Sequence, residues 1–267
     1  MSSAEQARLN RIVIAGLSGD SGKTFLSLGI TRAFKEKGLN VAAFKKGPDF
    51  IDAAWLGTAA GSPARNLDTY LMPAEAIRRT LIAAARKASI AVIEGNRGLY
   101  DGVDSSGSHS TAELSKLIRA PVVLVLDTTK ATRTVAALIL GCCRLDRDVE
   151  IAGVILNRVG TARQESVIRR AIREAVDLPV LGAVPRIREV ELPSRHLGLV
   201  TAVEHPRAEQ AIENTARIAR KYLDLDALVE IAGRSPRIEA PKRNREERAA
   251  PPGVRLSLIH ISEPTRP

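Results

Sequence analysis

Short, nearly unbroken apolar runs recur along the chain, and amphipathic stretches separate them. The runs are rich in Val, Ile and Leu and end at turn-forming residues, at 11–15, 41–44, 90–94, 121–127, 151–157 and 179–184. Runs of this kind are typical of strands that are covered on both faces. The intervening stretches carry apolar residues at helical spacing and predict helices at 23–37, 74–88, 111–118, 132–145 and 162–176, followed by 207–223 and 226–231.

This alternation predicts the fold class. Strands that alternate with helices of this length form βαβ units, which build a parallel sheet with right-handed crossovers. We therefore expect an α/β fold, with a mostly parallel sheet flanked by helices, over residues 1–232. Residues 233–255 are rich in Pro, Arg and Glu and predict a disordered linker. The last segment, 256–267, matches no pattern of the body and resembles translated adapter sequence, so we expect a non-native tail on a truncated chain.

Composition narrows the functional classes. The chain of 267 residues is 45% hydrophobic, which supports a sizeable core, and only 3% aromatic, which argues against a stacking surface for single-stranded nucleic acid. The net charge is +10, and eight Lys or Arg against four Glu from residue 233 onward leave +6 for the body, which could favour a polyanionic ligand or simply keep the protein soluble. We expect a cytoplasmic protein without membrane or nucleic-acid partners. Cys142 and Cys143 are adjacent and have neither disulfide nor metal-site spacing.

A glycine-rich segment, GLSGDSGKT at 16–24, lies between the first predicted strand and the first predicted helix. This is the context of a phosphate-binding loop, in which backbone N–H groups and a lysine bind phosphate and a Ser or Thr hydroxyl binds Mg²⁺. Five residues rather than four precede its last glycine, and the alternative is an ordinary Gly-rich turn. The sequence therefore predicts ATP and Mg²⁺ binding. The residues expected to bind the nucleotide are Gly19, Asp20, Ser21, Gly22, Lys23 and Thr24.

Three more polar groups follow predicted strands, where ligands of open α/β sheets collect. FKKGPDFID at 44–52 offers Lys45 to a phosphate or a carboxylate, and two acidic residues to a metal or a nucleophile; the alternative is a Gly-Pro turn with surface charges. Glu94 ends an apolar strand, where a carboxylate is costly unless it is paired or binds a metal. Asp101 lies in the glycine-rich loop that follows Glu94; the alternative for this segment is an ordinary Gly-rich connector with a capping acid. Asn157 ends another strand and could pair with adenine or cap the strand.

These blocks occur together and in order: AGLSGDSGKT, FKKGPDFID, VIEGNRGLYDG, APVVLVLD, GVILNRV and LPSRHLGLV. Over about residues 10–232 the chain resembles the amino-terminal domain of the cobyrinic acid a,c-diamide synthases. The resemblance implies a P-loop fold of the dethiobiotin synthetase-like type. It also implies ATP-dependent amidation of two carboxylates of a tetrapyrrole polycarboxylate through an acyl phosphate. Ammonia from glutamine would come from an amidotransferase domain that this chain lacks. The resemblance is also compatible with a homodimer.

The resemblance assigns roles by motif position. Lys23 and Thr24 would serve the nucleotide and Mg²⁺. The metal ligands would be Thr24, Asp49 and Glu94, the catalytic group would comprise Lys45, Asp52 and Asp101, and Asn157 would contact adenine. Residues 53–55 and 96–97 depart from the family pattern, which leaves a sirohaem-type or nickel-sirohydrochlorin substrate as an alternative.

Three other P-loop classes compete with this interpretation. They are ParA/MinD-type positioning ATPases, dethiobiotin synthetase and cobyric acid synthase. A positioning ATPase would carry a second lysine where this chain has Ser18. The other two would not account for the FKKGPDFID and LPSRHLGLV blocks.

Overall fold

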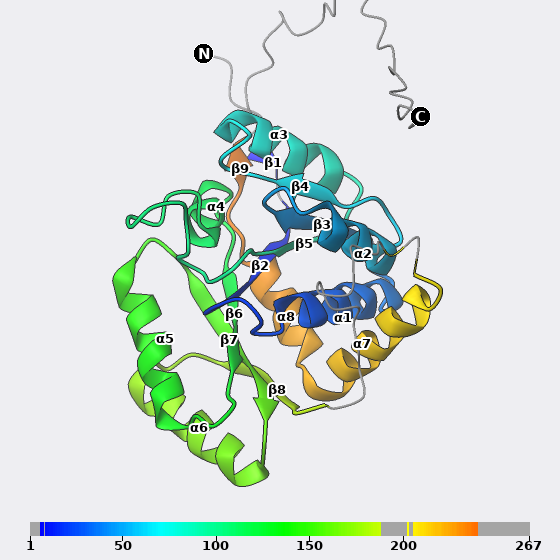
Figure 1. Ribbon diagram of the computed structural model, residues 1–267. Coiled ribbons are helices and arrows are strands. Elements are labelled where there is room, and N and C mark those ends of the chain that lie inside the picture. Colours follow the sequence, from blue (N-terminus) through cyan, green and yellow to red (C-terminus); the bar gives the residue numbers. More distant parts are fainter. Residues whose placement is uncertain (1–5, 8, 188–201, 203–204, 240–267) are drawn as a thin grey trace, which may run out of the picture.

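The computed structural model describes residues 6–7, 9–187, 202 and 205–239. Its centre is a seven-stranded sheet in the order β4-β3-β5-β2-β6-β7-β8, in which every neighbouring pair is parallel. Figure 1 shows helices on both sides of this sheet. The strands are β2 (Arg11–Gly16), β3 (Val41–Lys46), β4 (Arg65–Leu67), β5 (Ile90–Glu94), β6 (Val122–Asp127), β7 (Ile151–Val159) and β8 (Val180–Pro185). The predicted α/β class and its six strands are confirmed.

Two apolar clusters fill the space between the sheet and its two helical layers. Successive residues of β2 enter different clusters, Ile12 and Ile14 one and Val13 and Ala15 the other, as expected for a strand buried on both faces. One layer contains α1 (Lys23–Glu36), α2 (Phe50–Ala60), α7 (Ala208–Tyr222) and α8 (Leu225–Gly233). The other contains α3 (Ala74–Ala85), α4 (Thr111–Leu117), α5 (Arg133–Leu145) and α6 (Ala162–Ala175).

Helix α2 and strand β4 were not predicted. Asp49 caps α2 by accepting the N–H groups of Ile51 and Asp52, and Gly61 ends the helix in a left-handed conformation with φ 70°. The apolar residues of α2 are not confined to one stripe, so the segment lacks the helical period that reveals the other helices. Its first turn brings Asp52 back toward the end of β3, which the predicted Gly-Pro turn alone would not do.

The segment after α8 differs from the predicted linker at its start. The guanidinium of Arg11, which is fully buried, donates to the carbonyl oxygens of Ile118 and Pro236 (each 2.7 Å), and Ser235 Oγ donates to Arg11 O (2.8 Å). Strand β9 (Ile238–Glu239) then pairs with β1 (Gln6–Ala7). Residues 234–239 therefore pack on the domain. The rest of the predicted linker and tail, and the SRHLGL block, lie outside the described residues.

Across the described ranges, no helix is long and apolar enough to cross a membrane.

Candidate functional site

The phosphate loop joins β2 to α1 at the carboxyl edge of the sheet. Gly22 takes a left-handed φ of 91°, which a glycine adopts without strain, and it immediately precedes the first residue of α1. Lys23 Nζ donates to Ser18 O at 2.8 Å and lies 3.5 Å from Ser21 Oγ, so its ammonium group reaches back over the loop. Backbone N–H groups at a helix N-terminus and a lysine over the same loop form a site for phosphate oxygens.

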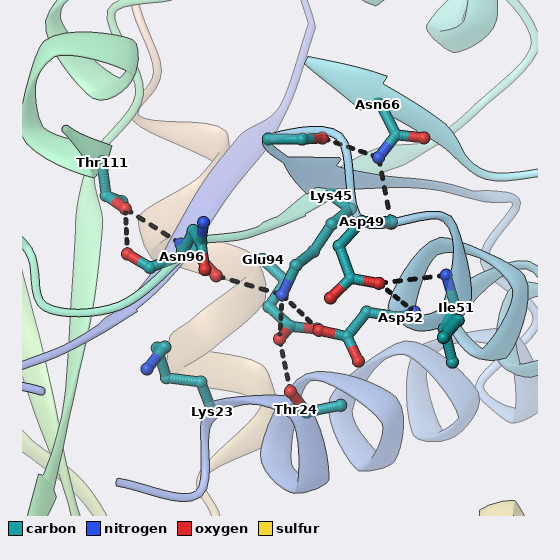
Figure 2. Close-up of polar contacts among 12 residues, drawn as sticks. Lys23, Thr24, Lys45, Asp49, Ile51, Asp52, Asn66, Glu94, Asn96 and Thr111 are labelled. Carbon is teal, nitrogen blue, oxygen red and sulfur yellow. Dashed lines mark hydrogen bonds and ion pairs between the residues drawn. The ribbon is translucent and has the colours of Figure 1, made fainter. Parts of the chain in front are cut away.

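Lys45, at the end of β3, joins the carboxylates of two other elements (Figure 2). Its Nζ lies 2.6 Å from Asp52 Oδ2 on α2 and donates to Glu94 Oε1 on β5 at 2.8 Å. Thr24 Oγ1, from the first turn of α1, donates to the same Glu94 oxygen at 2.6 Å. Four sequence-predicted residues thus meet in one network beside the phosphate loop.

This network is almost completely buried. Lys45 is 1% exposed, Glu94 0% and Asp52 7%. Burial lowers the pKa of Lys45, but the negative charges of Glu94 and Asp52 outweigh it, so the net shift is upward. Burial also raises the pKa of Glu94, and Lys45 and Thr24 only partly oppose this. Glu94 Oε2 has no hydrogen-bond partner among the described residues, which leaves one oxygen of a fully buried carboxylate free to accept a ligand.

Asp49 and Asp52 begin the same helix but make different contacts. Asp49 Oδ1 accepts the N–H groups of Ile51 (3.0 Å) and Asp52 (3.1 Å), whereas Asp52 forms the ion pair with Lys45. Figure 2 shows both carboxylates on the side of α2 that faces Lys45. The described residues contain no group of three or more His, Cys, Asp or Glu that could by itself hold a metal ion. Asp49 as a metal ligand therefore remains a prediction.

Asp101 shapes the loop after β5. Its Oδ2 accepts the N–H of Gly98 at 2.8 Å, and Leu99 N donates to Gly16 O at 2.7 Å, so this loop is held against the start of the phosphate loop. Tyr100 OH donates to Cys142 O at 2.7 Å and fastens the loop to α5. Asp101 itself is exposed. The structure gives it a loop-shaping contact, and its catalytic role remains a prediction.

Asn157 lies near the carboxyl end of β7 and contacts the phosphate loop from the side opposite to Lys45. Its Nδ2 donates to Ser21 O at 2.9 Å and its Oδ1 accepts Arg158 N at 3.0 Å. A Cβ at Gly22 would meet Nδ2 at 2.2 Å, so the close approach requires glycine there. In this structure the amide anchors the loop, and the predicted adenine contact remains a prediction.

Sequence reasoning missed Asn66 on β4. Its amide donates to Gly47 O (2.7 Å) and to Asp49 O (3.1 Å) and so holds the turn that carries the two aspartates. Nothing in the sequence marks this residue, because its role depends on β4 lying beside β3.

Comparison with known proteins finds similarity to a,c-diamide synthases. The chain is 42% identical over 250 residues to the cobyrinate a,c-diamide synthase of Archaeoglobus fulgidus, covering 93% of this chain and 54% of the relative. It is 44% identical over 232 residues to the hydrogenobyrinate a,c-diamide synthase of Mycobacterium tuberculosis, covering 85% and 50%. The chain thus spans about half the length of these relatives.

A solved structure supports the fold alone. The signal recognition particle receptor FtsY from Elizabethkingia anophelis superposes with a TM-score of 0.51 at 18% identity, covering 80% of this chain and 67% of that one. The family model of the CobQ/CobB/MinD/ParA nucleotide binding domain matches residues 12–200, which include the phosphate loop, Lys45, Glu94 and Asn157. Because that match extends over most of the chain, the chain belongs to this family of nucleotide-binding domains.

Proposed function

We propose that this chain is the ATP-dependent half of an amide ligase that activates peripheral carboxylates of cobyrinic acid or a closely related tetrapyrrole. The observation that carries the proposal is the buried network of Lys45, Glu94 and Asp52 at the edge of the phosphate loop. The names of the relatives favour an amide ligase over the positioning ATPases that share the family. A cytoplasmic location agrees with this role.

The chemistry requires a better leaving group than a carboxylate offers. A carboxylate oxygen of the substrate attacks the γ-phosphorus of ATP, the bond to the β,γ-bridging oxygen breaks, and ADP leaves. Ammonia then attacks the acyl phosphate carbon, loses a proton and expels inorganic phosphate, which leaves the amide. Such transfers depend mainly on positioning and charge neutralisation. Lys23 would neutralise the phosphates, and Lys45 would hold Asp52 and Glu94 in place beside them.

The residues present fit a magnesium ion. Mg²⁺ in phosphoryl-transfer sites is held by one or two carboxylates together with nucleotide phosphates and water, and when bound it neutralises charge on the phosphates. Thr24 Oγ1 and Glu94 are already within 2.6 Å of each other, and Glu94 Oε2 is buried without a hydrogen-bond partner in the described part of the chain. Thr24 and Glu94, with Asp49, would hold the ion.

Ammonia would come from a partner activity. The relatives are about twice as long as the matched segment, so we propose that glutamine is hydrolysed outside the residues that carry this site. The chain alone should therefore use ammonium ions but not glutamine. Glutaminase activity of the purified chain would contradict this assignment.

The test is ADP release by the full chain with cobyrinic acid, Mg²⁺ and ammonium chloride. We expect ATP consumption to require the tetrapyrrole, and hydroxylamine to replace ammonia and trap the acyl phosphate as a hydroxamate. Lys45→Met should abolish the stimulated rate, whereas Lys37→Met, an exposed lysine on the far end of α1, should retain it. ATP turnover that responds to DNA or lipid vesicles and not to the tetrapyrrole would overturn the proposal.

A further inference from the structure

Most of the exposed large apolar side chains among the described residues lie at one edge of the sheet. Six are exposed in the described part of the chain, and four of them follow the carboxyl ends of β3, β4 and β5. Single exposed apolar residues are ordinary, but a group beside a buried charged site is typical of a ligand surface. We call these four residues the apolar rim; they are Phe50, Tyr70, Leu71 and Val103, each 62–68% exposed.

Contacts between the three loops hold the apolar rim together. The Asn66 amide, on β4, donates to Gly47 O and to Asp49 O, next to Phe50. The ring of Tyr70 meets that of His109 edge to face at 5.3 Å between centroids, which joins the loop after β4 to the loop after β5. His109 takes a left-handed φ of 60° at this contact. The strands β4, β3 and β5 are neighbours in the sheet (Figure 1), so their loops share one edge.

Hydrogen bonds hold the backbone that carries the apolar rim. Asp68 Oδ1 accepts the N–H groups of both Tyr70 (2.8 Å) and Leu71 (3.3 Å) and shapes the turn that presents them. Val103 N donates to Ser108 O at 2.9 Å, which closes the loop that carries Val103. A preorganised apolar surface loses little conformational entropy when a ligand covers it.

Positive charge lies among the same loops. Lys46 ends β3 and is nearly buried, and Arg97 is exposed in the loop after β5. Burial lowers the pKa of Lys46, Asp68 opposes this shift, and the nearby positive charge of Arg97 lowers it further. Lys46 ends β3 and Arg97 follows the end of the neighbouring strand β5, so both cations lie at one edge of the sheet, where a ligand carboxylate could contact them.

We propose that the apolar rim binds the macrocycle face of a tetrapyrrole polycarboxylate, while Lys46 and Arg97 bind a peripheral carboxylate that is not being amidated. This inference rests on the proposed function and assigns the substrate surface of that same site. A tetrapyrrole polycarboxylate has a broad apolar ring with carboxylates around its edge, which complements the apolar rim and the two cations beside it. A small polar carboxylate would bury no apolar surface against the rim. The first turn of α2 connects Phe50 to Asp52, two residues on, so the rim leads directly to the Lys45 network.

The test measures the Kd of cobyrinic acid for the full chain by equilibrium dialysis. Leu71→Ser and Val103→Ser remove exposed apolar groups and leave the fold intact. Leu145→Ser is the matched control, because that leucine on α5 is 71% exposed and far along the chain from the rim loops. We expect the Kd to rise about 10-fold or more in each rim variant, as expected when roughly half of a buried leucine or valine contact is lost. The control should stay within about 2-fold, and the Kd of ATP should not change in any variant.

A second arm tests the charges. Arg97→Gln should weaken binding of cobyrinic acid and reduce its dependence on salt, whereas Arg86→Gln, at the far end of α3, should do neither. Equal Kd values for the Leu71, Val103 and Leu145 variants would overturn the inference while leaving the proposed function intact. Failure of the unaltered chain to bind any tetrapyrrole would overturn both.

Discussion

Replacing Lys45 by methionine tests whether the buried network is a true charge cluster. Lys45 is the cation between Asp52 and Glu94, with Nζ–O distances of 2.6 and 2.8 Å and side-chain exposures of 2% or less for Lys45 and Glu94. Methionine fills a similar volume without charge and leaves two buried carboxylates facing each other. Removing one partner from a buried ion pair costs about 3–5 kcal/mol, because the remaining charge is uncompensated. We expect the free energy of unfolding in metal-free buffer at pH 7.5 to fall by this amount.

The measurement is urea denaturation followed by circular dichroism, and Lys37→Met is the control. Lys37 forms an ion pair of similar length with Asp226 (2.7 Å), but these side chains are 39% and 86% exposed, so its loss should cost about 0.5 kcal/mol or less. Adding Glu94→Gln to Lys45→Met should recover about 2 kcal/mol or more, because one of the two buried charges is then removed.

The effect should also depend on pH. Burial raises the pKa of Glu94, and loss of Lys45 raises it further because Lys45 is the charge that lowers it. A carboxyl group whose pKa is raised on folding contributes most stability below its unfolded pKa and loses that contribution as pH rises through its folded pKa. The deficit of Lys45→Met should therefore shrink between pH 7.5 and pH 5. A loss under about 1 kcal/mol at pH 7.5, or an equal loss at both pH values, would refute the charge-cluster interpretation.

Three further predictions concern contacts away from this cluster. Arg11→Met leaves four carbonyl acceptors without their buried donor and should lower the free energy of unfolding, measured by urea denaturation, by about 3 kcal/mol or more. Proteolysis after residue 233 should become faster. An unchanged proteolysis rate would show that Arg11 does not hold residues 234–239 on the domain. Tyr100→Phe removes the bond to Cys142 O and should lower the free energy of unfolding by about 1 kcal/mol in the same assay. Asn157→Ala removes the donor to Ser21 O and should raise the Kd of ATP in equilibrium dialysis; a smaller rise in the Kd of GTP would support the predicted adenine contact, and an equal rise would show that the amide acts only on the loop.

The sequence predicts six strands of the main sheet and most helices, because each strand is a short apolar run and each of these helices has apolar residues at helical spacing. The six predicted strands match β2, β3 and β5 to β8, and the glycine-rich segment connects β2 to α1 as expected. What a single segment cannot show is which strands lie side by side. Strands β3 and β5 are neighbours although residues 47–89 separate them, and this pairing places Lys45 opposite Glu94. The candidates could be identified from the sequence, but their ion pairs could not.

The misses have the same physical origin. The cap that Asp49 provides for α2 is a local signal for a helix. The Gly-Pro dipeptide before it indicates a turn, and the apolar residues that follow do not lie on one helical face, so the sequence does not predict α2. The composition of segment 234–239 predicts a linker. Its packing is not visible from the sequence, because its partner is Arg11 at the other end of the domain. A basic residue at the start of an otherwise apolar strand was the available signal, since a buried arginine needs acceptors.

The order of the strands places the two proposed ligands, the nucleotide and the tetrapyrrole, on different parts of the same sheet edge. Strand β2, with the phosphate loop, lies between β5 on one side and β6 on the other. Asn157 contacts the loop from the β7 side, while Lys45, Asp52 and the apolar rim lie on the β3–β5 side. The two sides meet where Thr24 of α1 donates to Glu94 of β5. In an open parallel sheet the crevice beside such a central strand is where ligands bind. A nucleotide on the loop would therefore present its terminal phosphate toward the β3–β5 side, where a substrate carboxylate at the edge of the Lys45 network could attack it.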